Sequence, residues 1–460
     1  MKKILLGVVA LLAACFANAA DYAQYYKDLP VELQQVKAPT IPDTRVSIVD
    51  YGAVGDGQTL CTEAIQKAIN DLAKKGGGHV DVPAGIWLFS PIKLKSNIDL
   101  HLAKNAVMQL TEMKSLHKDA KTGKIRPGIS ASNAQDVSIT GDGIIDGNGE
   151  FWRGVKKTKQ SEVEWKEYQA LGGQVSADGK VWYPYNLKSQ ANVTDSKEKE
   201  EALRVNMVRF SDCERVMIQG VTLQNSPKFH FTPNDCKDVI IDGVTVRCPW
   251  NAQNGDAIDI GTSQRVLIVN NTIDCGDDGI CMKGGTGDKS IGHGANEDIL
   301  IAYNTVFHAH GGFVIGSEFS AGMKKIVVHD NTFSSTDTGL RFKSAIGRGG
   351  ETEQIYCYNI YMTDIKNEAV VFETTYADVA ISGTTGPGTG TKWVPNFKDI
   401  HISNVICNGA KTAIAAHGAK GMIHDIEISN STFFYTKFGT QIDTSCDVKL
   451  KDVKILTYKK

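Results

Sequence analysis

Residues 257–283 read AIDIGTSQRVLIVNNTIDCGDDGICMK. The segment consists of short apolar runs rich in β-branched residues, and clusters of Gly, Ser, Thr, Asn and Asp separate the runs. Runs of this length between turn residues are typical of β-strands. The segment therefore predicts several short strands joined by turns, followed from residue 279 by the first strand of an equivalent unit.

The unit that begins Arg265-Val-Leu-Ile recurs along the chain from about residue 136. Apart from two long gaps, the copies are 22 to 33 residues apart, and no amphipathic segment of helical length separates them. This argues against a βαβ protein and against a leucine-rich horseshoe. The copies begin at Asp136, Arg215, Asp238, Arg265, Asp298, Lys325, Gln354, Asp399, Asp425 and Asp447. We predict an all-β fold, a single-stranded right-handed parallel β-helix with one coil per repeat and coils about 4.8 Å apart.

Two further patterns are structural. Asn271, Asn304 and Asn331 occupy the same place in three successive repeats, which indicates stacked side-chain amides at a recurring turn and not ligands. Residues 61–73 have apolar side chains at helical spacing. Because an uncovered coil is an unpaired sheet edge, we expect a short helix there to cap the N-terminal end of the solenoid.

The chain begins with an expected export signal at residues 1–19. Two lysines precede an apolar run, residues 4–14, that is too short to span a bilayer. Ala17-Asn-Ala fits a cleavage site for soluble export, whereas Leu12-Ala-Ala-Cys15 resembles the box of a lipoprotein, and both alternatives stay open. We expect a periplasmic or secreted protein that is attached to a membrane only if Cys15 carries lipid.

The remaining chain divides into an N-terminal segment, residues 20–45, and a β-helix domain, residues 46–460. Insertions interrupt the repeat near residues 150–205, 284–297 and 377–398. Insertions in a solenoid often build its binding face. The first insertion carries aromatic residues that either stack on sugars or form a local core, namely Trp152, Trp165, Trp182, Tyr183 and Tyr185.

Charge and cysteine usage exclude several classes of partner. The chain has 50 basic and 52 acidic residues, so no overall field recruits nucleic acid, and an anionic partner must be bound locally. The spacing of the cysteines matches neither a metal site nor a disulfide framework, so those on strands are expected to be buried small residues. We expect a monomer without a metal or other cofactor.

Aligning four equivalent strands predicts which polar residues meet. The strands are Ala257-Ile-Asp-Ile-Gly, Gly279-Ile-Cys-Met-Lys, Gly312-Phe-Val-Ile-Gly and Gly339-Leu-Arg-Phe-Lys. In this register Asp256 lies beneath Asp278, one coil away, and Asp277 precedes Asp278. Strand alternation places Asp259, Arg341, Lys283 and Lys343 on the outward face, while residues such as Ile258 face the core.

A cluster of three carboxylates suggests acid/base chemistry of the kind that glycoside hydrolysis requires. Inverting hydrolases use a carboxylic acid that protonates the leaving oxygen and a carboxylate about 6.5–9.5 Å away that activates water. We assign Asp277 as the acid and Asp256 with Asp278 as water activators. Crowding of like charges is expected to raise at least one pKa of the cluster, which keeps a proton available near neutral pH.

The basic residues indicate an acidic substrate. Arg341 binds a carboxylate bidentately, and Lys283 and Lys343 act as point charges. His310 precedes the third strand by two residues, between the carboxylates and the Arg-x-Lys pair, so we place it in the site as a partner of the acid or of a sugar hydroxyl.

These motifs resemble the polygalacturonase family, the inverting glycoside hydrolases of family 28. Its four motifs occur in order as Asn254-Gly-Asp256, Gly276-Asp-Asp278, His310-Gly with Gly316-Ser downstream, and Arg341-Phe-Lys343. The similarity extends from about Val46 to Leu456. The resemblance implies a pectin-lyase-like β-helix and the same catalytic roles. It also implies galacturonate binding by Arg341 and Lys343, with Tyr376 and Asn254 as further substrate contacts.

The departures from the family pattern concern backbone fit, because the catalytic side chains are present. Gly255, Ala309 and Phe342 stand where the family has Thr, Gly and Ile. The stretch 310–318 and Arg348-Gly-Gly resemble bacterial exo-acting members, whose loops close one end of the cleft. We therefore expect hydrolysis of α-1,4 bonds in polygalacturonate with exo action, and residues 150–205 and 284–297 are the candidate closing loops.

Other activities stay open at this point. An endo-polygalacturonase and a rhamnogalacturonan hydrolase are the nearest alternatives, although the latter group usually alters the Asp-Asp, His and Arg-x-Lys set. A pectate lyase shares the fold and substrate but eliminates with Ca²⁺, an ion that takes six to eight oxygens. A non-catalytic β-helical adhesin or glycan-binding protein represents a different class.

Overall fold

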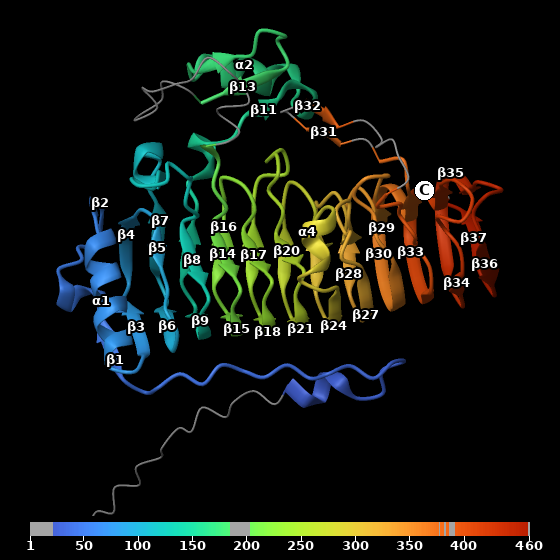
Figure 1. The fold of residues 1–460 in the computed structure, drawn as a ribbon. Helices are drawn as coiled ribbons and strands as arrows, with labels where there is room; N and C mark the ends of the chain where they lie inside the picture. The colour runs from blue at the N-terminus through green and yellow to red at the C-terminus, as the bar shows by residue number, and fades with distance from the viewer. Residues whose placement is uncertain (1–21, 185–202, 377, 381–382, 386–391, 459–460) are drawn as a thin grey trace, which may run out of the picture.

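The computed structural model describes residues 22–184, 203–376, 378–380, 383–385 and 392–458, so the expected export signal lies outside the described residues. The chain winds into a long parallel β-helix whose axis runs from the blue N-terminal coils to the red C-terminal coils (Figure 1). This confirms the predicted fold class. Among the described residues, no helix is long and apolar enough to cross a membrane.

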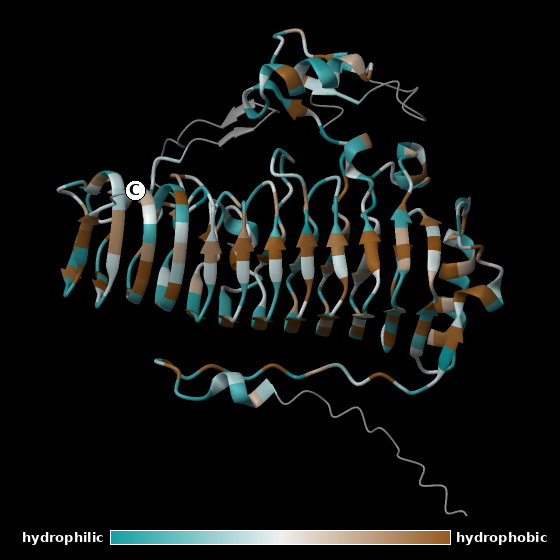
Figure 2. Cartoon of the chain, turned by 180° about the vertical axis from the view of Figure 1, so that it is seen from behind, coloured by the Kyte–Doolittle hydropathy of each residue, from teal (hydrophilic) through white to brown (hydrophobic). Residues whose placement is uncertain are grey.

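One coil illustrates how the sequence forms the fold. It contains β20 (Ile258–Gly261), β21 (Gln264–Val269) and β22 (Thr272–Asp274), after which β23 (Ile280–Lys283) starts the next coil. β20 and β23 pair in parallel, with Ile258 opposite Ile280 and Asp259 opposite Cys281. The inward apolar side chains of these strands are fully buried. Figure 2 shows apolar residues as brown bands that recur along the strands of the solenoid.

The strands form three parallel faces. The first face contains β5 (Ile92–Lys93), β8 (Ile129–Ser132), β14 (Val208–Ser211), β17 (Phe231–Asn234), β20, β23, β26 (Phe313–Ile315) and β29 (Leu340–Lys343). The second contains β1 (Arg45–Ser47), β3 (Gly78–Val82), β6 (Ile98–Leu102), β9 (Gln135–Gly141), β15 (Glu214–Gln219), β18 (Lys237–Asp242), β21, β24 (Asn296–Ala302) and β27 (Met323–His329).

The third face contains β2 (Asp56–Leu60), β4 (Gly85–Phe89), β7 (Ala106–Leu110), β10 (Ile144–Asp146), β16 (Thr222–Gln224), β19 (Thr245–Arg247), β22, β25 (Thr305–Phe307) and β28 (Thr332–Ser334). The C-terminal coils are completed by β30 (Thr352–Glu373), β33 (Ile400–His417), β34 (Ile426–Ser429), β35 (Thr432–Ile442), β36 (Val448–Lys451) and β37 (Lys454–Thr457). β30 and β33 each continue through more than one face.

The first residue of most repeats lies near the start of a second-face strand and bends the chain there. Asp136, Arg215, Asp238 and Arg265 all have left-handed backbones, with φ between 53° and 57°. Their side chains pair across coils, because Arg215 binds Asp136 at 2.7 Å and Arg265 binds Asp238 at 2.8 Å. The recurring charged position that marks the repeat in the sequence is therefore a bend near the start of these strands, and ion pairs join it between paired coils.

The asparagine ladder has the predicted structural role. The Oδ1 atom of Asn271 accepts the backbone N–H of Val244 at 2.8 Å, and Asn304 and Asn331 repeat this contact one and two coils further on at 3.0 and 2.9 Å. All three side chains are buried. Because a buried backbone N–H must find a partner, the ladder satisfies one donor in each coil.

The N-terminal cap is the predicted helix. α1 (Thr62–Lys74) packs its apolar side over the first coils, and Ile65, Ala68, Ile69 and Leu72 are fully buried. It closes the blue end of the solenoid in Figure 1. The helical spacing of the apolar residues was sufficient to identify this element from the sequence.

The segment before the β-helix forms a strap that the repeat pattern does not predict. It starts in the short 3₁₀ helix Tyr22–Tyr26 and runs along the outside of the second face (Figure 1). Tyr22 and Leu33 pack against outward apolar residues of β18, β21, β24 and β27, among them Leu267 and Leu300. The backbone N–H groups of Lys37 and Thr40 in the strap also donate hydrogen bonds to the side chains of Asp238 and Asp136, respectively.

The first insertion forms a small unit of its own. It contains β11 (Val155–Lys156), α2 (Glu162–Ala170), β12 (Gln174–Val175) and β13 (Val181–Tyr183), and the three strands form an antiparallel sheet. Trp165 and Trp182 pack with Val155 in a local core, while Trp152 joins the core of the β-helix. Of the two alternatives for the described aromatic residues, the local core is confirmed for Trp165 and Trp182; Tyr185 lies outside the described residues.

The other insertions are short. Residues 284–297 contain the single helical turn α4 (Asp288–Ile291), and residues 377–398 contain the hairpin β31 (Asp378–Ala380) and β32 (Gly383–Thr385). The nine described cysteines are all free thiols, and eight of them are buried. For the described residues, the expectation that the cysteines on strands are buried is confirmed.

Candidate active site

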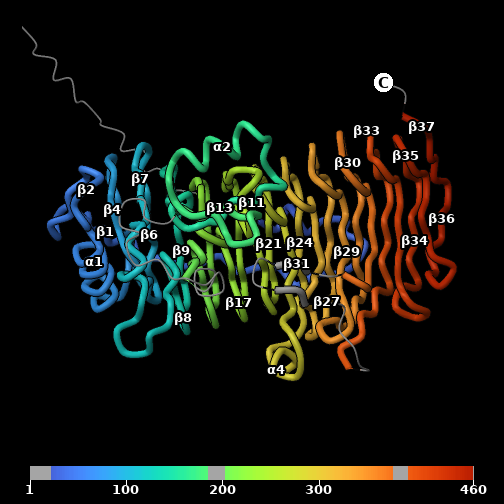
Figure 3. Tube along the Cα trace, turned by 90° about the horizontal axis from the view of Figure 1, so that it is seen from above, coloured from blue at the N-terminus to red at the C-terminus, as the bar shows by residue number. Residues whose placement is uncertain are grey.

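The outward surface of the first face carries a cleft of about 880 Å³. Its floor is formed by β14, β17, β20 and β23, and the first insertion, with α2, β11 and β13, lies above these strands in the view from above (Figure 3). Asp256, Asp259, Asp277 and Asp278 line the cleft together with His310. The structure thus brings the three predicted aspartates and the histidine to one place.

The predicted register between the aspartates is correct. The backbone N–H of Ala257 donates to the carbonyl of Asp278 at 3.0 Å, so Asp256 and Asp278 are neighbours on adjacent coils. The turn before β23 also reaches back to the previous coil, because the N–H of Asn254 donates to Oδ2 of Asp277 at 3.1 Å. The parallel pairing of β20 with β23 therefore holds the carboxylates together.

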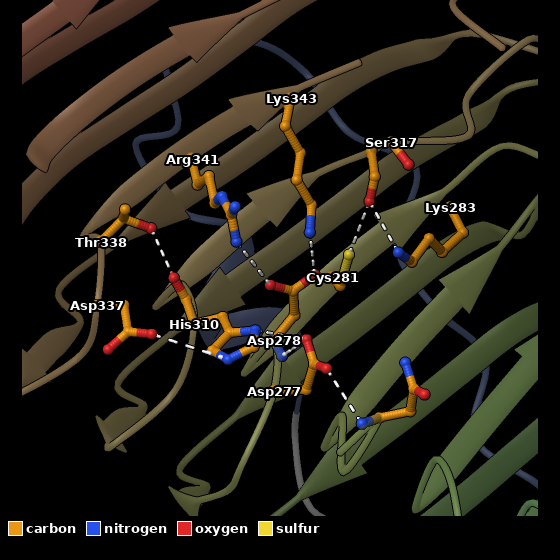
Figure 4. Close-up of polar contacts among 12 residues, drawn as sticks. Asp277, Asp278, Cys281, Lys283, His310, Ser317, Asp337, Thr338, Arg341 and Lys343 are labelled. Atoms are coloured by element: carbon orange, nitrogen blue, oxygen red, sulfur yellow. Dashed lines mark hydrogen bonds and ion pairs between the residues drawn. The ribbon is translucent and has the colours of Figure 1, made fainter. Parts of the chain in front are cut away.

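Asp277 sits in an environment that favours a carboxylate. Its Oδ1 atom lies 2.8 Å from Nδ1 of His310 and accepts the N–H of Asp278 at 3.1 Å (Figure 4). Burial raises the pKa of Asp277, but His310, Lys343 and Lys159 outweigh burial and hold it well below its usual range. With 16% of its side chain exposed, Asp277 is more accessible than Asp278, which is 1% exposed.

Asp278 is held by two cations from the fourth strand. Nζ of Lys343 donates to Oδ2 of Asp278 at 2.7 Å, and Nη1 of Arg341 lies 3.5 Å from Oδ1 (Figure 4). Burial raises the pKa of Asp278, and Lys343 and Arg341 more than offset this effect, so the pKa lies below its usual value. Asp278 is therefore ionised at neutral pH.

Asp256 and Asp259 have the opposite environment. Both are buried, and in each the Oδ1 atom makes no hydrogen bond within the described residues. Burial and the neighbouring carboxylates raise the pKa of Asp256 well above its usual value; burial raises that of Asp259 to about 7, although Lys283 opposes the rise. The expectation that at least one pKa of the cluster is raised is confirmed. The raised pKa values belong to Asp256 and Asp259, however, and not to Asp277, which was assigned as the acid.

The raised pKa of Asp259 makes a stability prediction. In the unfolded chain this carboxyl ionises near 3.8, whereas in the folded protein it stays protonated up to about 7. Its contribution to stability is therefore fully present below pH 3.8 and is lost as the pH rises to about 7, at a cost on the order of 4 kcal/mol. Asp259→Asn should raise the melting temperature at pH 8 much more than at pH 4.

Thermal unfolding of both proteins across this pH range measures the effect. Asp142→Asn, an exposed carboxylate outside the cleft, provides the control. A difference between Asp259→Asn and the parent that does not change with pH would show that Asp259 is ionised throughout.

His310 contacts groups from three segments. Its Nδ1 faces Asp277, its Nε2 lies 3.2 Å from Nζ of Lys159, and Oδ2 of Asp337 lies 3.8 Å from the same nitrogen. The hydroxyl of Thr338 donates to the backbone carbonyl of His310 at 2.8 Å (Figure 4). The sequence predicts the acid or a sugar hydroxyl as the partner of His310. The structure places His310 beside the acid, Asp277.

Tyr376 and the basic residues form the other side of the site. The ring of Tyr376 lies 5.4 Å from the Arg341 guanidinium, 5.0 Å from Nζ of Lys343 and 5.9 Å from the Arg348 guanidinium. Such contacts orient cations over an aromatic face. Lys283 extends along the same wall and donates to the carbonyl of Gly316 at 2.9 Å. Arg341, Lys343, Lys283 and Tyr376 are thus gathered beside Asp278.

Asn254 lies at the site through its backbone more than through its side chain. Its backbone is left-handed, with φ 52°, and its Oδ1 accepts a hydrogen bond from Arg204 at 2.7 Å. In this structure the predicted substrate contact therefore binds Arg204, and its backbone positions Asp277.

Three residues of the site were not predicted. Strand alternation predicts that Asp259 faces outward, but no role was assigned to it. That outward position was the signal in the sequence that could have identified it as a site residue. Lys159 and Arg204 come from the first insertion and its edge, where the chain does not follow the repeat. The sequence therefore does not predict which residues of the solenoid they contact. Only the folded insertion shows that they reach the cleft.

The donor atoms of Asp277, Asp278 and His310 lie within 4.8 Å of one another, which is also the spacing of a metal site. Both oxygens of Asp278, however, face the cations of Lys343 and Arg341. Three donors also fall well short of the six to eight oxygens that Ca²⁺ takes. This donor set fits a carboxylate cluster neutralised by basic side chains better than a calcium site.

Comparison with known proteins assigns both parts of the chain. Residues 161–450 match the family model of the glycosyl hydrolases of family 28, and residues 45–161 match that of rhamnogalacturonase A/epimerase, pectate lyase-like proteins. The exo-poly-α-D-galacturonosidase of Dickeya chrysanthemi is 30% identical over 376 residues, which cover 78% of this chain and 61% of that protein. The chain thus spans less than two thirds of this relative.

Two other relatives differ in their mode of action. An endo-polygalacturonase of Pectobacterium carotovorum subsp. carotovorum is 26% identical, with 75% of this chain and 77% of that protein covered. The crystal structure of a hyperthermoactive exopolygalacturonase from Thermotoga maritima superimposes with a TM-score of 0.71 at 26% identity, covering 91% of this chain and 94% of that chain.

Proposed function

Because the chain belongs to the glycosyl hydrolases of family 28, we propose that it hydrolyses α-1,4-galacturonosidic bonds in polygalacturonate with inversion of configuration. The observation that carries the proposal is the juxtaposition of Asp277, Asp278 and Lys343 in one cleft, with the Arg341 guanidinium 3.5 Å from Asp278. The carboxylates supply acid/base chemistry, and the cations bind the carboxylates of a sugar acid.

Asp277 is the proposed general acid and Asp278 the proposed base. Asp278 is ionised and can accept a proton from water, while the neutral carboxyl of Asp256 on the adjacent coil orients that water by hydrogen bonding. Asp277 is the more exposed carboxylate of the Asp-Asp pair, which suits a group that must reach the glycosidic oxygen. This division refines the expectation that Asp256 and Asp278 act alike.

Asp277 must be protonated before it can act as an acid. In the free site Lys343 is one of the groups that lower its pKa. A galacturonate carboxylate bound next to Arg341 and Lys343 brings a negative charge that counteracts this effect, so substrate binding raises the pKa of Asp277. The raised pKa of Asp256 and Asp259 means that the cluster already holds protons in the free protein at neutral pH.

The proposed mode is exo action. The first insertion lies above the strands that form the floor of the cleft (Figure 3), and the segment around α4 contributes Thr286, Lys289 and His293 to the wall of the cleft. These are the two loops expected to close the cleft. The Dickeya and Thermotoga proteins, both exo-acting by name, are among the relatives, and this supports the same mode here.

A time course on polygalacturonate, resolved by oligomer size, tests the activity and its mode. We expect only monomer or dimer at every time point, because a cleft that is closed at one end binds the polymer only by its chain end. A ladder of intermediate oligomers would instead establish endo action. An ultraviolet-absorbing unsaturated product that a chelator abolishes would establish a lyase, and no release of reducing sugar would favour a glycan-binding protein.

The proposal includes export and a monomeric state. Polygalacturonate is a polymer outside the cell, which agrees with the export signal expected in residues 1–19 and, if Cys15 is lipidated, with attachment to a membrane. The site residues described above all come from one chain, which supports the proposed monomer.

A further inference from the structure

The two ring nitrogens of His310 contact groups of different character. Nδ1 lies 2.8 Å from Oδ1 of Asp277, and Nε2 lies 3.2 Å from Nζ of Lys159. A lysine ammonium has three hydrogens to donate and no acceptor. At Nε2 it can therefore pair only with an unprotonated nitrogen, which assigns the ring proton to Nδ1, facing Asp277.

Lys159 is fixed in this position by a second contact. Its Nζ also donates to the carbonyl of Gly276 at 3.3 Å, in the turn that carries Asp277. Lys159 ends the 3₁₀ turn Lys157–Lys159, which leads into α2 and belongs to the insertion with its own apolar core. A folded unit outside the solenoid thus places this ammonium beside the catalytic turn.

Asp337 shows what the lysine prevents. Its Oδ2 lies 3.8 Å from Nε2 of His310, and its Oδ1 binds Lys366 at 3.2 Å. Without Lys159, a carboxylate on each side of the ring would favour protons on both nitrogens. The Lys159 ammonium itself lowers the pKa of Asp277 from the Nε2 side of the ring. A positive charge on the ring would lie directly against the carboxylate, at 2.8 Å, and would lower this pKa further, so Asp277 would be a poorer acid.

We propose that Lys159 is a positioning residue that holds His310 as the neutral Nδ1–H tautomer and so keeps Asp277 able to carry a proton. The catalytic part of this inference rests on the proposed function, whereas the assignment of the tautomer does not. The neutral ring donates Nδ1–H to Asp277 and stabilises the carboxylate that forms when the acid has given its proton to the leaving oxygen.

Nuclear magnetic resonance of the unliganded protein labelled with ¹⁵N-histidine tests the tautomer without reference to activity. His310→Gln assigns the signals of this ring. At neutral pH we expect a pyridine-type resonance for Nε2 and a pyrrole-type resonance for Nδ1. In Lys159→Met the Nε2 resonance should move to the pyrrole-type range, while Lys166→Met, an exposed lysine on α2, should leave it unchanged.

Kinetics on polygalacturonate test the consequence. Lys159→Met should lower kcat by about tenfold or more, a part of the roughly 10²- to 10⁴-fold that general acid catalysis supplies, with a smaller change in KM. Lys159→Arg should restore most of the loss, because it keeps a cationic donor near Nε2.

Ring signals that do not change in Lys159→Met would show that Lys159 does not hold the tautomer, and a pyrrole-type Nε2 in the parent protein would overturn the tautomer itself. A changed tautomer with unchanged kcat would contradict the catalytic role. If the parent protein releases no sugar, the proposed function is wrong, yet the ring signals still decide the role of Lys159.

Discussion

Replacing Asp277 with Asn should lower kcat on polygalacturonate by about 10²- to 10⁴-fold, the range that positioned general acids contribute. Asn has the same shape but no proton to give to the leaving oxygen. KM should change little, because Arg341 and Lys343 still bind the substrate. The alkaline limb of the pH profile of kcat should also disappear, since in the parent protein that limb reports loss of the acidic proton.

Two controls separate the chemical effect from a structural one. Asp274→Asn changes an exposed aspartate three residues earlier, with 48% of its side chain accessible, and should leave kcat unaltered. Thermal unfolding should show that Asp277→Asn remains folded. If the variant keeps the activity and the alkaline limb of the parent, Asp277 is not the acid; the same experiment on Asp256→Asn then tests the carboxyl with the raised pKa.

Removing the ammonium of Lys343 should destabilise the fold as well as the site. Lys343 and Asp278 form a contact of 2.7 Å, and only 6% and 1% of their side chains are exposed. Lys343→Met leaves the Asp278 carboxylate buried with the more distant Arg341. The expected loss in unfolding free energy is about 3–5 kcal/mol, the usual consequence of removing one partner of a buried ion pair.

The double variant Lys343→Met, Asp278→Asn distinguishes this cause from loss of packing. If the unpaired charge is responsible, the double variant should recover much of the stability while remaining inactive. Lys449→Met, which removes an exposed lysine 4.0 Å from Asp447, should cost at most about 1 kcal/mol. Equilibrium unfolding in urea measures all three; equal destabilisation of the single and double variants would contradict the proposed cause.

The proposed protonation states of the carboxyl groups link the two experiments. Lys343 holds Asp278 ionised and also lowers the pKa of Asp277, whereas burial keeps protons on Asp256 and Asp259. A substrate that is itself an acid changes this balance when it binds. In the proposed mechanism the basic residues therefore have two effects: they bind the sugar acid, and they set which carboxyls are protonated before it binds.

Repeat periodicity determined the fold and much of the site. A coil of fixed length places residues one repeat apart on adjacent strands, so the alignment that puts Asp256 beneath Asp278 is a statement about space as well as sequence. The same argument identified the outward Arg341 and the structural role of Asn304. Amphipathic spacing identified α1 because burial of one helix side depends only on local sequence.

Only the tertiary structure decided what lies outside the repeat and which carboxyl carries a proton. The strap from Tyr22 and the insertion that carries Lys159 have no coil register, so their positions depend on packing against distant surfaces. The pKa values depend on burial and on charges from several coils: Asp256 and Asp277 have the same carboxyl, yet only Asp277 meets His310 and Lys159. Sequence spacing thus predicts that the acids lie close together, whereas their three-dimensional surroundings decide which of them is protonated.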